Sequence, residues 1–309
     1  MYELERISKV FESAVEIPFD DFSRIAIISD CHRGDGSWGD NFLANKNIYF
    51  AALNFYYNSS YTYIELGDGD ELWENSKFSD IINIHIDVFN KLAQFYKKGR
   101  LHFLYGNHDM IKKSQSFVKK NLYYYINELD GRFISLFKNI NIHEGLILKH
   151  SITNDRIFLT HGHQADFFND RLWRLSGFLV RHLWKQLELF GFRDPTSAAK
   201  NYDKQKSVGK RLIEWARINK NILITGHTHR STFPEVGEPP YFNTGSCVHP
   251  HGITVIEITN GTITLVKWQV KARSDGTLYI GRNTMAGPRK LKDYFNNLKS
   301  NLSENEMTK

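Results

Sequence analysis

The stretch that decides the fold is Ile25-Ala-Ile-Ile-Ser-Asp30-Cys-His32. Its apolar first half predicts a buried β-strand, and this strand ends in an Asp-x-His pair. Residues i and i+2 of a strand point to the same side, so the side chains of Asp30 and His32 can converge on one point in space. A carboxylate and an imidazole that converge in this way suit a metal ion, although a single Asp-x-His pair is weak evidence by itself.

Two more predicted strands in the first half of the chain end in polar side chains. The strand at 61–66 is followed by Gly67-Asp68, and the strand at 101–105 is followed by Gly106-Asn107-His108. Apolar periodicity predicts helices between the strands, at 42–57 and 79–98. This alternation of strand, polar loop and helix predicts a parallel α/β sheet, which binds its ligands beyond the carboxyl ends of its strands.

The second half of the chain predicts further strands with little helix between them. The strand at 156–160 ends in His161-Gly-His163, and the strand at 221–225 ends in Gly226-His227-Thr-His229. Other predicted strands lie at 140–148, 240–246, 252–258 and 262–268. We therefore expect a second sheet packed on the first, followed from about 282 to 309 by a flexible basic tail that holds one short helix before a frayed end.

Seven candidate metal ligands follow five of these strands: Asp30, His32, Asp68, Asn107, His161, His227 and His229. Carboxylate, carboxamide and imidazole groups without a thiolate suit manganese, iron or zinc rather than an iron–sulfur cluster or a structural zinc. Seven ligands exceed the needs of one such ion. Two ions roughly 3.5–4 Å apart, bridged by one carboxylate, would use all seven and would form a site that acts on phosphate esters. The predicted cofactor is thus a pair of divalent ions, with manganese preferred and iron or zinc as alternatives.

These residues resemble the motif blocks of the calcineurin-like metallophosphoesterases, which have the forms D-x-H, GD-x-x-D/E, GNH-D/E, H-G and GH-x-H. All five blocks occur here in the same order, between Asp30 and His229. The resemblance implies a four-layer αββα sandwich of two mixed β-sheets flanked by helices. It assigns Asp30, His32 and His229 to one metal, and Asn107, His161 and His227 to the other. Asp68 would bridge the two, and a bridging hydroxide would attack phosphorus in line.

His108 is the candidate general acid. Held next to Asn107, it can donate a proton to the departing oxygen or stabilise the charge that develops on phosphate. By the same resemblance, Glu71 is the carboxylate that orients His108 and raises its basicity. Arg33 and His163 are candidate substrate-binding residues, because Arg33 directly follows the first ligand pair and His163 lies two positions after a ligand.

The composition favours one large domain in a reducing compartment. The chain has 309 residues, 41% of them hydrophobic, which is enough for a single domain over 1–309 with a sizeable core. Its two cysteines do not suggest a disulfide framework or a zinc knuckle. The first residues lack the apolar core of a signal peptide, and no segment approaches the roughly 20 apolar residues of a membrane span. We expect a soluble, cytoplasmic protein.

A basic insertion at about 165–220 separates the last two motif blocks. It holds 12 Lys and Arg against 6 Asp and Glu, so the rest of the chain holds 28 of each sign (40 less 12, and 34 less 6). Its sequence predicts an amphipathic helix with one basic face. The apolar stripe on the other face consists of Leu172, Leu175, Leu179, Leu183, Leu187 and Phe190. Two interpretations stay open. The helix packs on the sandwich with its charges in water, or it is a lid that receives an acyl chain while its cations contact phosphate or an anionic membrane.

The lid interpretation draws on a second resemblance. Gly67-Asp-Gly-Asp-Glu-Leu-Trp73 is similar to the GD-x-F-D-L-W block of the UDP-2,3-diacylglucosamine pyrophosphohydrolases, a branch of the same family with a helical lid at this place. That branch usually has arginine where this chain has His108, which resembles the wider family of phosphomonoesterases and phosphodiesterases instead. The expected substrate is a phosphate-containing small molecule or a lipid-linked one, and the lid would add peripheral contact with an anionic membrane.

The leading hypothesis is a dinuclear metal-dependent hydrolase of a phosphoester or pyrophosphate bond. The basic insertion allows a nuclease or cyclic-nucleotide phosphodiesterase as an alternative, although nucleic acid is not the favoured partner. A third possibility, from a different class, is a scaffold that keeps the fold and has lost catalysis. The seven intact ligand positions argue against the scaffold.

Overall fold

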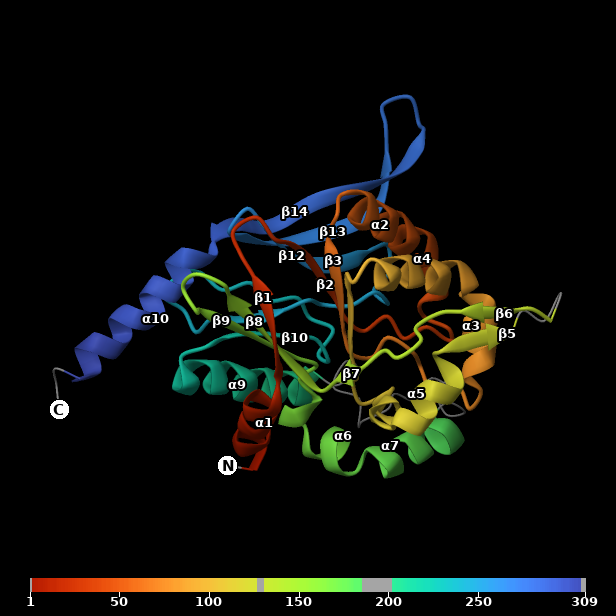
Figure 1. Ribbon diagram of the computed structural model, residues 1–309, viewed down its shortest axis with the longest axis horizontal. Helices are drawn as coiled ribbons and strands as arrows, with labels where there is room; N and C mark the ends of the chain where they lie inside the picture. The colour runs from red at the N-terminus through yellow and green to blue at the C-terminus, as the bar shows by residue number, and fades with distance from the viewer. Residues whose placement is uncertain (1, 127–130, 185–201, 307–309) are drawn as a thin grey trace.

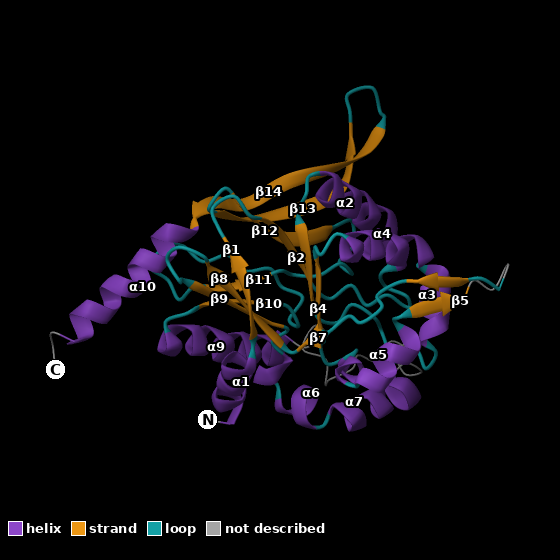
Figure 2. Cartoon of the chain, in the orientation of Figure 1, coloured by secondary structure: helices purple, strands orange, loops and turns teal. Residues whose placement is uncertain are grey.

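Two β-sheets lie face to face at the centre of the computed structural model, which describes residues 2–126, 131–184 and 202–306. One sheet has seven strands in the order β14-β13-β12-β2-β3-β4-β7, and the other has five in the order β1-β8-β9-β10-β11. Helices lie outside both sheets (Figures 1 and 2). The predicted αββα sandwich of two mixed sheets is confirmed.

The seven-stranded sheet combines a parallel and an antiparallel part. Its strands are β2 (Arg24–Ile28), β3 (Thr62–Leu66), β4 (Leu101–Leu104), β7 (Ile142–His143), β12 (Ile253–Thr259), β13 (Thr262–Ala272) and β14 (Leu278–Lys290). β2, β3, β4 and β7 are parallel neighbours, whereas β12, β13 and β14 add to the β2 edge in antiparallel fashion. The carboxyl ends of β2, β3 and β4 therefore lie at one edge of the sheet.

The five-stranded sheet brings the two remaining site strands side by side. Its strands are β1 (Val15–Phe19), β8 (Gly145–His150), β9 (Arg156–Thr160), β10 (Ile222–Thr225) and β11 (Tyr241–Asn243). β8 and β9 are antiparallel, and the other neighbours are parallel. A separate small hairpin pairs β5 (Tyr124–Ile126) with β6 (Phe133–Ser135). Because β9 and β10 are parallel neighbours, the loops that carry His161 and His227 start at the same edge.

The helices form the two outer layers. Those on the seven-stranded sheet are α2 (Lys46–Asn58), α3 (Phe78–Ile84), α4 (Ile86–Lys97) and α5 (Gln115–Asn121). Those on the five-stranded sheet are α1 (Tyr2–Ser13) and α9 (Tyr202–Asn219). Short 3₁₀ turns are η1 (Leu43–Asn45), η2 (Met110–Lys113) and η3 (His163–Ala165). The single helix predicted at 79–98 is in fact α3 and α4, which meet at the buried His85, where the ring bonds to Asp40 at 3.0 Å.

Strand β2 is apolar at every position after Arg24 because both of its faces are buried. Ile25 and Ile27 pack into the core between the two sheets, while Ala26 and Ile28 pack into the core under the helices of the outer layer. Alternate residues of a strand face opposite sides, so a strand buried on both faces needs an unbroken apolar run. Burying each isoleucine contributes about 1.5–3 kcal/mol. This burial fixes the strand that carries Asp30 and His32.

The C-terminal part of the chain corrects one prediction. The flexible tail expected from about 282 is wrong at its start, because residues up to Lys290 belong to β14 and pair with β13. The following helix, α10 (Leu291–Glu306), buries Leu291, Tyr294 and Phe295 in the core between the sheets. In Figure 1, α10 then extends away from the body, and the β13–β14 hairpin projects on another side.

Where one amphipathic helix was predicted, the described part of the insertion has several separate helical segments. It contains α6 (Phe167–Arg171), α7 (Trp173–Leu179), the π-helical segment η4 (Val180–Trp184) and α9. Leu172 interrupts the predicted helix, and Leu175 of its apolar stripe is 52% exposed. The predicted stripe residues Leu187 and Phe190 lie outside the described residues. In the part of the chain that is described, no helix combines the length and apolarity needed to cross a membrane.

Candidate metal centre

The loops after three strands hold their candidate ligands in an unusual backbone conformation. Asp30 and His32 after β2, Asp68 after β3, and His227 and His229 after β10 all have positive φ, between 47° and 65°. This left-handed region costs a residue with a side chain about 1–3 kcal/mol and is tolerated where function requires it. Five such residues at strand ends therefore mark a site that the surrounding fold holds under strain.

Glycines let the strand-end loops approach each other. A Cβ at Gly226 would collide with the carboxylate of Asp30, and a Cβ at Gly106 would collide with that of Asp68. The glycines of the Gly-Asn-His and Gly-His motifs are thus needed for space. Any larger residue would push a carboxylate out of the site.

The first group of candidate ligands is Asp30, His32 and His229. The Nε2 atoms of His32 and His229 are 3.1 Å apart, and Nε2 of His229 is 3.0 Å from Oδ1 of Asp30. The amide of His227 and the hydroxyl of Ser29 donate to the other oxygen, Oδ2, which leaves Oδ1 without a hydrogen bond. Two imidazole nitrogens and a carboxylate oxygen that face one another match the ligand set of a divalent cation.

The second group is Asp68, His161 and His227. Asn107 stands between Gly106 and His108, which both lie against Asp68. Nδ1 of His161 donates to the carbonyl of Leu66 at 2.9 Å, so its Nε2 is an acceptor when the ring is neutral. That Nε2 is 3.1 Å from Oδ2 of Asp68. The buried Oδ1 of Asn107 and Nε2 of His161 and His227 have no hydrogen-bond partner. Buried polar atoms are rarely left unsatisfied, so these orphaned acceptors fit a bound cation.

Asp68 lies between the two groups. Its Oδ2 is 3.1 Å from Nε2 of His161 and 3.8 Å from Nε2 of His32, while its Oδ1 accepts a hydrogen bond from the amide of His108 at 2.8 Å. One carboxylate therefore contacts both ligand groups. The candidate ligands predicted from the sequence thus gather in two neighbouring groups, each of which could hold a divalent ion.

The electrostatics of the centre also favour cations. Burial lowers the pKa of His161, but the carboxylates of Asp68 and Asp30 outweigh it and raise that pKa to about 9. Burial raises the pKa of Asp68, yet the histidines around it, His161 foremost, hold it well below the usual range. Burial lowers the pKa of both His227 and His229, which favours the neutral form that binds metal. A field that attracts a proton also attracts a metal ion.

Glu71 orients two histidines at once. One carboxylate oxygen is 2.8 Å from Nδ1 of His108, and the other is 2.7 Å from Nδ1 of His32. Each ring thereby turns its Nε2 away from Glu71, as in other metal sites where a carboxylate fixes the tautomer of a histidine. Burial lowers the pKa of His108, but Glu71 and Asp68 outweigh it and raise that pKa above its usual value. The geometry agrees with the pairing of Glu71 and His108 that the sequence predicted.

Arg33 has a different role from the one predicted. Its side chain is 1% exposed, and its guanidinium donates to both carboxylate oxygens of Glu65 and to Asp70, each at 2.7 Å. Lys112 bonds to Asp70 and Asp109 at 2.6 Å. Because the Arg33 side chain is buried within this ion network, it is not accessible to a substrate, which corrects the prediction that Arg33 binds phosphate. It instead braces the loops that carry Asp68 and Asn107.

Replacing Arg33 by lysine should therefore lower stability rather than substrate affinity. Lysine keeps the charge but cannot form the two-pronged contact with Glu65, and a hydrogen bond lost between buried charged groups costs about 2 kcal/mol. Urea unfolding of the purified protein measures this loss. Arg217→Lys is the matched control, because Arg217 makes a similar two-pronged contact with Glu214 on the surface and its loss should leave the midpoint nearly unchanged. Equal losses in the two variants would contradict the bracing role.

His163 is fully buried next to the ligand rings of His161 and His227, with ring centroids 5.5 and 6.5 Å away. Its Nε2 is 3.8 Å from Oδ1 of Asp170. Since no part of the ring reaches the surface, the structure does not place His163 where a substrate could touch it. The prediction that it binds substrate is not supported.

Three neighbours of the centre were not identified from the sequence. Trp73 stacks on His108, with ring centroids 4.1 Å apart. Oδ2 of Asp166 lies 3.5 Å from Nε2 of His227. Asp109 accepts a hydrogen bond from the amide of Gly106 at 2.7 Å and so shapes the loop of Asn107. For Trp73 and Asp109 a signal existed, because both stand within the motif blocks; nothing in the sequence pointed to Asp166.

Two comparisons with known proteins find similarity to this chain. A solved structure, Vps29 of Chaetomium thermophilum, is similar with a TM-score of 0.38 and 12% identity over 85% of this chain and 96% of that chain. The comparison with curated proteins gives no match. The family model described as calcineurin-like phosphoesterase matches residues 23–231, which is more than half of the chain and includes all seven candidate ligands. The chain that carries this centre is a member of the calcineurin-like phosphoesterase family.

Proposed function

We propose that this protein is a dinuclear metal-dependent phosphoesterase. The observation that carries the proposal is the position of Asp68, whose Oδ2 lies between His161 of one ligand group and His32 of the other, at 3.1 and 3.8 Å. When bound, two divalent cations neutralise the oxygens of a phosphoryl group and activate a water molecule for attack on phosphorus. The absence of thiolate ligands favours manganese, with iron or zinc as alternatives.

The residues of the chain supply the remaining chemistry. Glu71 holds Nδ1 of His108, so the Nε2 of that ring is the one free to face a substrate. His108 is 20% exposed at its side chain, whereas the ligand His161 is completely buried. A histidine at the open rim, beside the metal ligands, is placed to give a proton to the leaving oxygen. We assign His108 as the general acid and Glu71 as the residue that positions it.

A metal titration with a panel of substrates tests the proposal. Metal-free protein should gain hydrolysis of a phosphomonoester, a phosphodiester or a pyrophosphate when manganese is added, and it should bind two ions per chain. Its free energy of unfolding should also rise, by about 2.7 kcal/mol for one site at a free metal concentration a hundred times the dissociation constant. Binding of two ions without hydrolysis of any of the three substrate classes would overturn the phosphoesterase function.

A further inference from the structure

A cavity of about 370 Å³ adjoins the metal centre on the side of His108. His108 belongs to both, since it lines the cavity and its ring centroid lies 4.6 Å from that of the candidate ligand His32. A substrate whose phosphoryl group sits at the metals and whose leaving oxygen meets His108 therefore directs its alcohol portion into this cavity. The volume is within the range of small-molecule binding sites.

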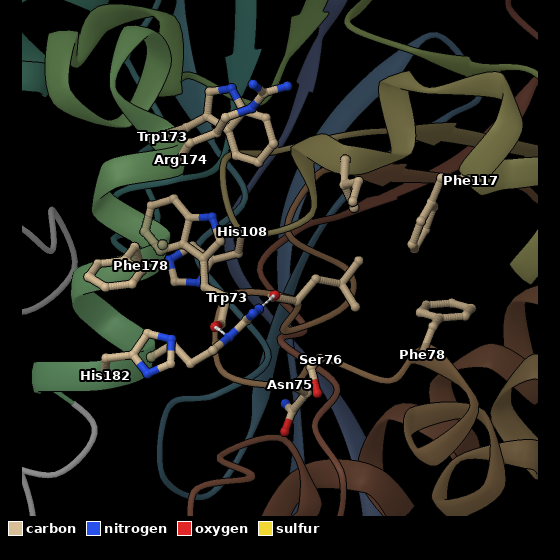
Figure 3. A pocket seen from close by; sticks show the side chains of 14 residues that line it. Trp73, Asn75, Ser76, Phe78, His108, Phe117, Trp173, Arg174, Phe178 and His182 are labelled. Carbon is tan, nitrogen blue, oxygen red and sulfur yellow. Dashed lines mark hydrogen bonds between the residues drawn. The ribbon is translucent and has the colours of Figure 1, made fainter.

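The lining of the cavity is unusually rich in aromatic rings. Figure 3 shows Phe78 and Phe117 on one side, and Trp73, Phe178 and His182 with His108 on the other. Phe178 is 60% exposed, so much of its ring is uncovered in the described structure. Flat faces and edges of this kind pair favourably with a ring system, which stacks at a lower entropic cost than a flexible chain.

Trp73 forms a closely packed part of the cavity wall. Its side chain is nearly buried, and its indole Nε1 has no hydrogen-bond partner. The indole lies against Gly177, where a Cβ would come within 2.9 Å of Cδ1 of Trp73. Gly177 also lines the cavity, and a larger residue there would displace the indole.

Hydrogen bonds from the insertion connect the wall of the cavity to the loop that carries Glu71. The guanidinium of Arg181, in η4, donates to the carbonyls of Leu72 and Trp73 at 2.8 Å, one residue or two after Glu71. These are the bonds drawn in Figure 3. The wall formed by α7 and η4 is therefore held in a fixed place relative to His108. The site is preformed, which favours selective binding.

We propose that this cavity binds the alcohol portion of the substrate, and that this portion is a bulky aromatic ring system. The inference rests on the proposed phosphoesterase function and narrows its substrate class. Arg174 lines the cavity, and Lys113 lies over the ring of Trp173, which lines it too, so these cations can hold a further anionic group of the substrate.

Three phosphate esters with alkyl alcohols of similar acidity separate ring recognition from leaving-group chemistry: ethyl, octyl and quinolinylethyl phosphate, or their methyl diesters. For the manganese-loaded enzyme, kcat/KM for the quinolinylethyl ester should exceed that of the ethyl ester about tenfold or more, since one stacked ring contributes a factor of this order. The octyl ester should stay well below the quinolinylethyl ester. An octyl ester that matches or exceeds it, or an ethyl ester that equals it, would overturn the proposal.

Phe178→Ala should reduce the preference for the ring-bearing ester over the ethyl ester about fivefold. Phe178 is largely exposed, so the variant is expected to fold normally. The matched control is Phe168→Ala, because Phe168 is 55% exposed in the same insertion and does not line the cavity. The control should leave the preference unchanged. A Phe178 variant with unchanged preference would count against the cavity as the binding site.

A binding measurement separates this inference from the proposed function. Calorimetry should show saturable binding of quinolinylethanol to the metal-free protein, weakened about fivefold by Phe178→Ala. Binding of the alcohol without hydrolysis of any ester would leave the cavity in place and overturn the phosphoesterase function. Hydrolysis of the ethyl ester without binding of the alcohol would do the reverse.

Discussion

Replacing Asp68 by asparagine should leave a folded protein that no longer holds two divalent ions. The change removes the negative charge of a carboxylate that lies between the two groups of ligands, while it keeps the shape of the side chain. His161 and His32, 3.1 and 3.8 Å from the lost charge, would then bring two dications together without a shared anion. We expect metal content to fall below two per chain and kcat/KM to fall by at least about 1,000-fold.

Metal content by mass spectrometry and initial rates on the best substrate measure this effect. Asp40→Asn is the matched control, because Asp40 is another buried carboxylate that bonds to a histidine, His85, without belonging to either ligand group. The control should lose stability and retain two ions. If the Asp68 variant still bound two ions and kept normal rates, the bridging position would have no functional meaning.

Replacing His108 by alanine should lower kcat by about 100- to 10,000-fold and leave the metal content at two ions per chain. His108 supplies no ligand atom in the two groups that contain Asp68 or Asp30, so the centre keeps its donors. The fall in kcat should be smaller for an aryl ester, because its leaving group needs no proton. That dependence on the leaving group is the signature of a missing general acid.

The control for this variant is His251→Ala, which removes an exposed histidine outside the centre. A second variant, His108→Gln, keeps a polar group near Glu71 but cannot serve as an acid, and it should be impaired as strongly as the alanine variant. Should metal binding collapse while activity per bound ion stays normal, His108 would be a structural residue and the assignment as acid would be wrong.

The strand ends were predictable because they depend on local patterns. The period of two in β2 separates Ile25 and Ile27 from Ala26 and Ile28. β2 ends at Ile28, so this period does not extend to Asp30 and His32. Parallel strands carry their loops to one edge of a sheet, so the other candidate ligands were predictable near this pair. The positive φ of His32 was beyond prediction, since it depends on the loops that surround it.

The role of Arg33 could not be predicted because its partners come from other strands. Glu65 lies in β3, 32 residues away, and a single arginine after a metal motif gives no sign of whether it faces substrate or the protein interior. Once Glu65 and Asp70 lie opposite Arg33, burying the three charged groups together costs less free energy than burying any one of them without its partners. Position next to a motif is therefore weak evidence for contact with substrate.

Long-range contacts also explain the errors in the insertion and at the C-terminus. The stripe from Leu172 assumed one straight helix, but Arg181 turns toward the carbonyls of Leu72 and Trp73, more than 100 residues away. Residues after Arg282 are polar enough to suggest a tail, yet they pair with β13 in a regular register. In both cases the deciding contact lies far along the chain.

Each group of candidate ligands combines residues that follow strands of both sheets. Asp30 and His32 follow β2 of the seven-stranded sheet, whereas His229 follows β10 of the five-stranded sheet, so a cation bound to these three residues would act as a cross-link between the layers. Metal affinity then becomes part of folding energy, because no single sheet contains a complete ligand group. In a cell with too little of the metal, the metal-free chain would open more readily where the two sheets meet, and proteases would cleave it faster. Such a cell would lose folded protein as well as enzymatic turnover.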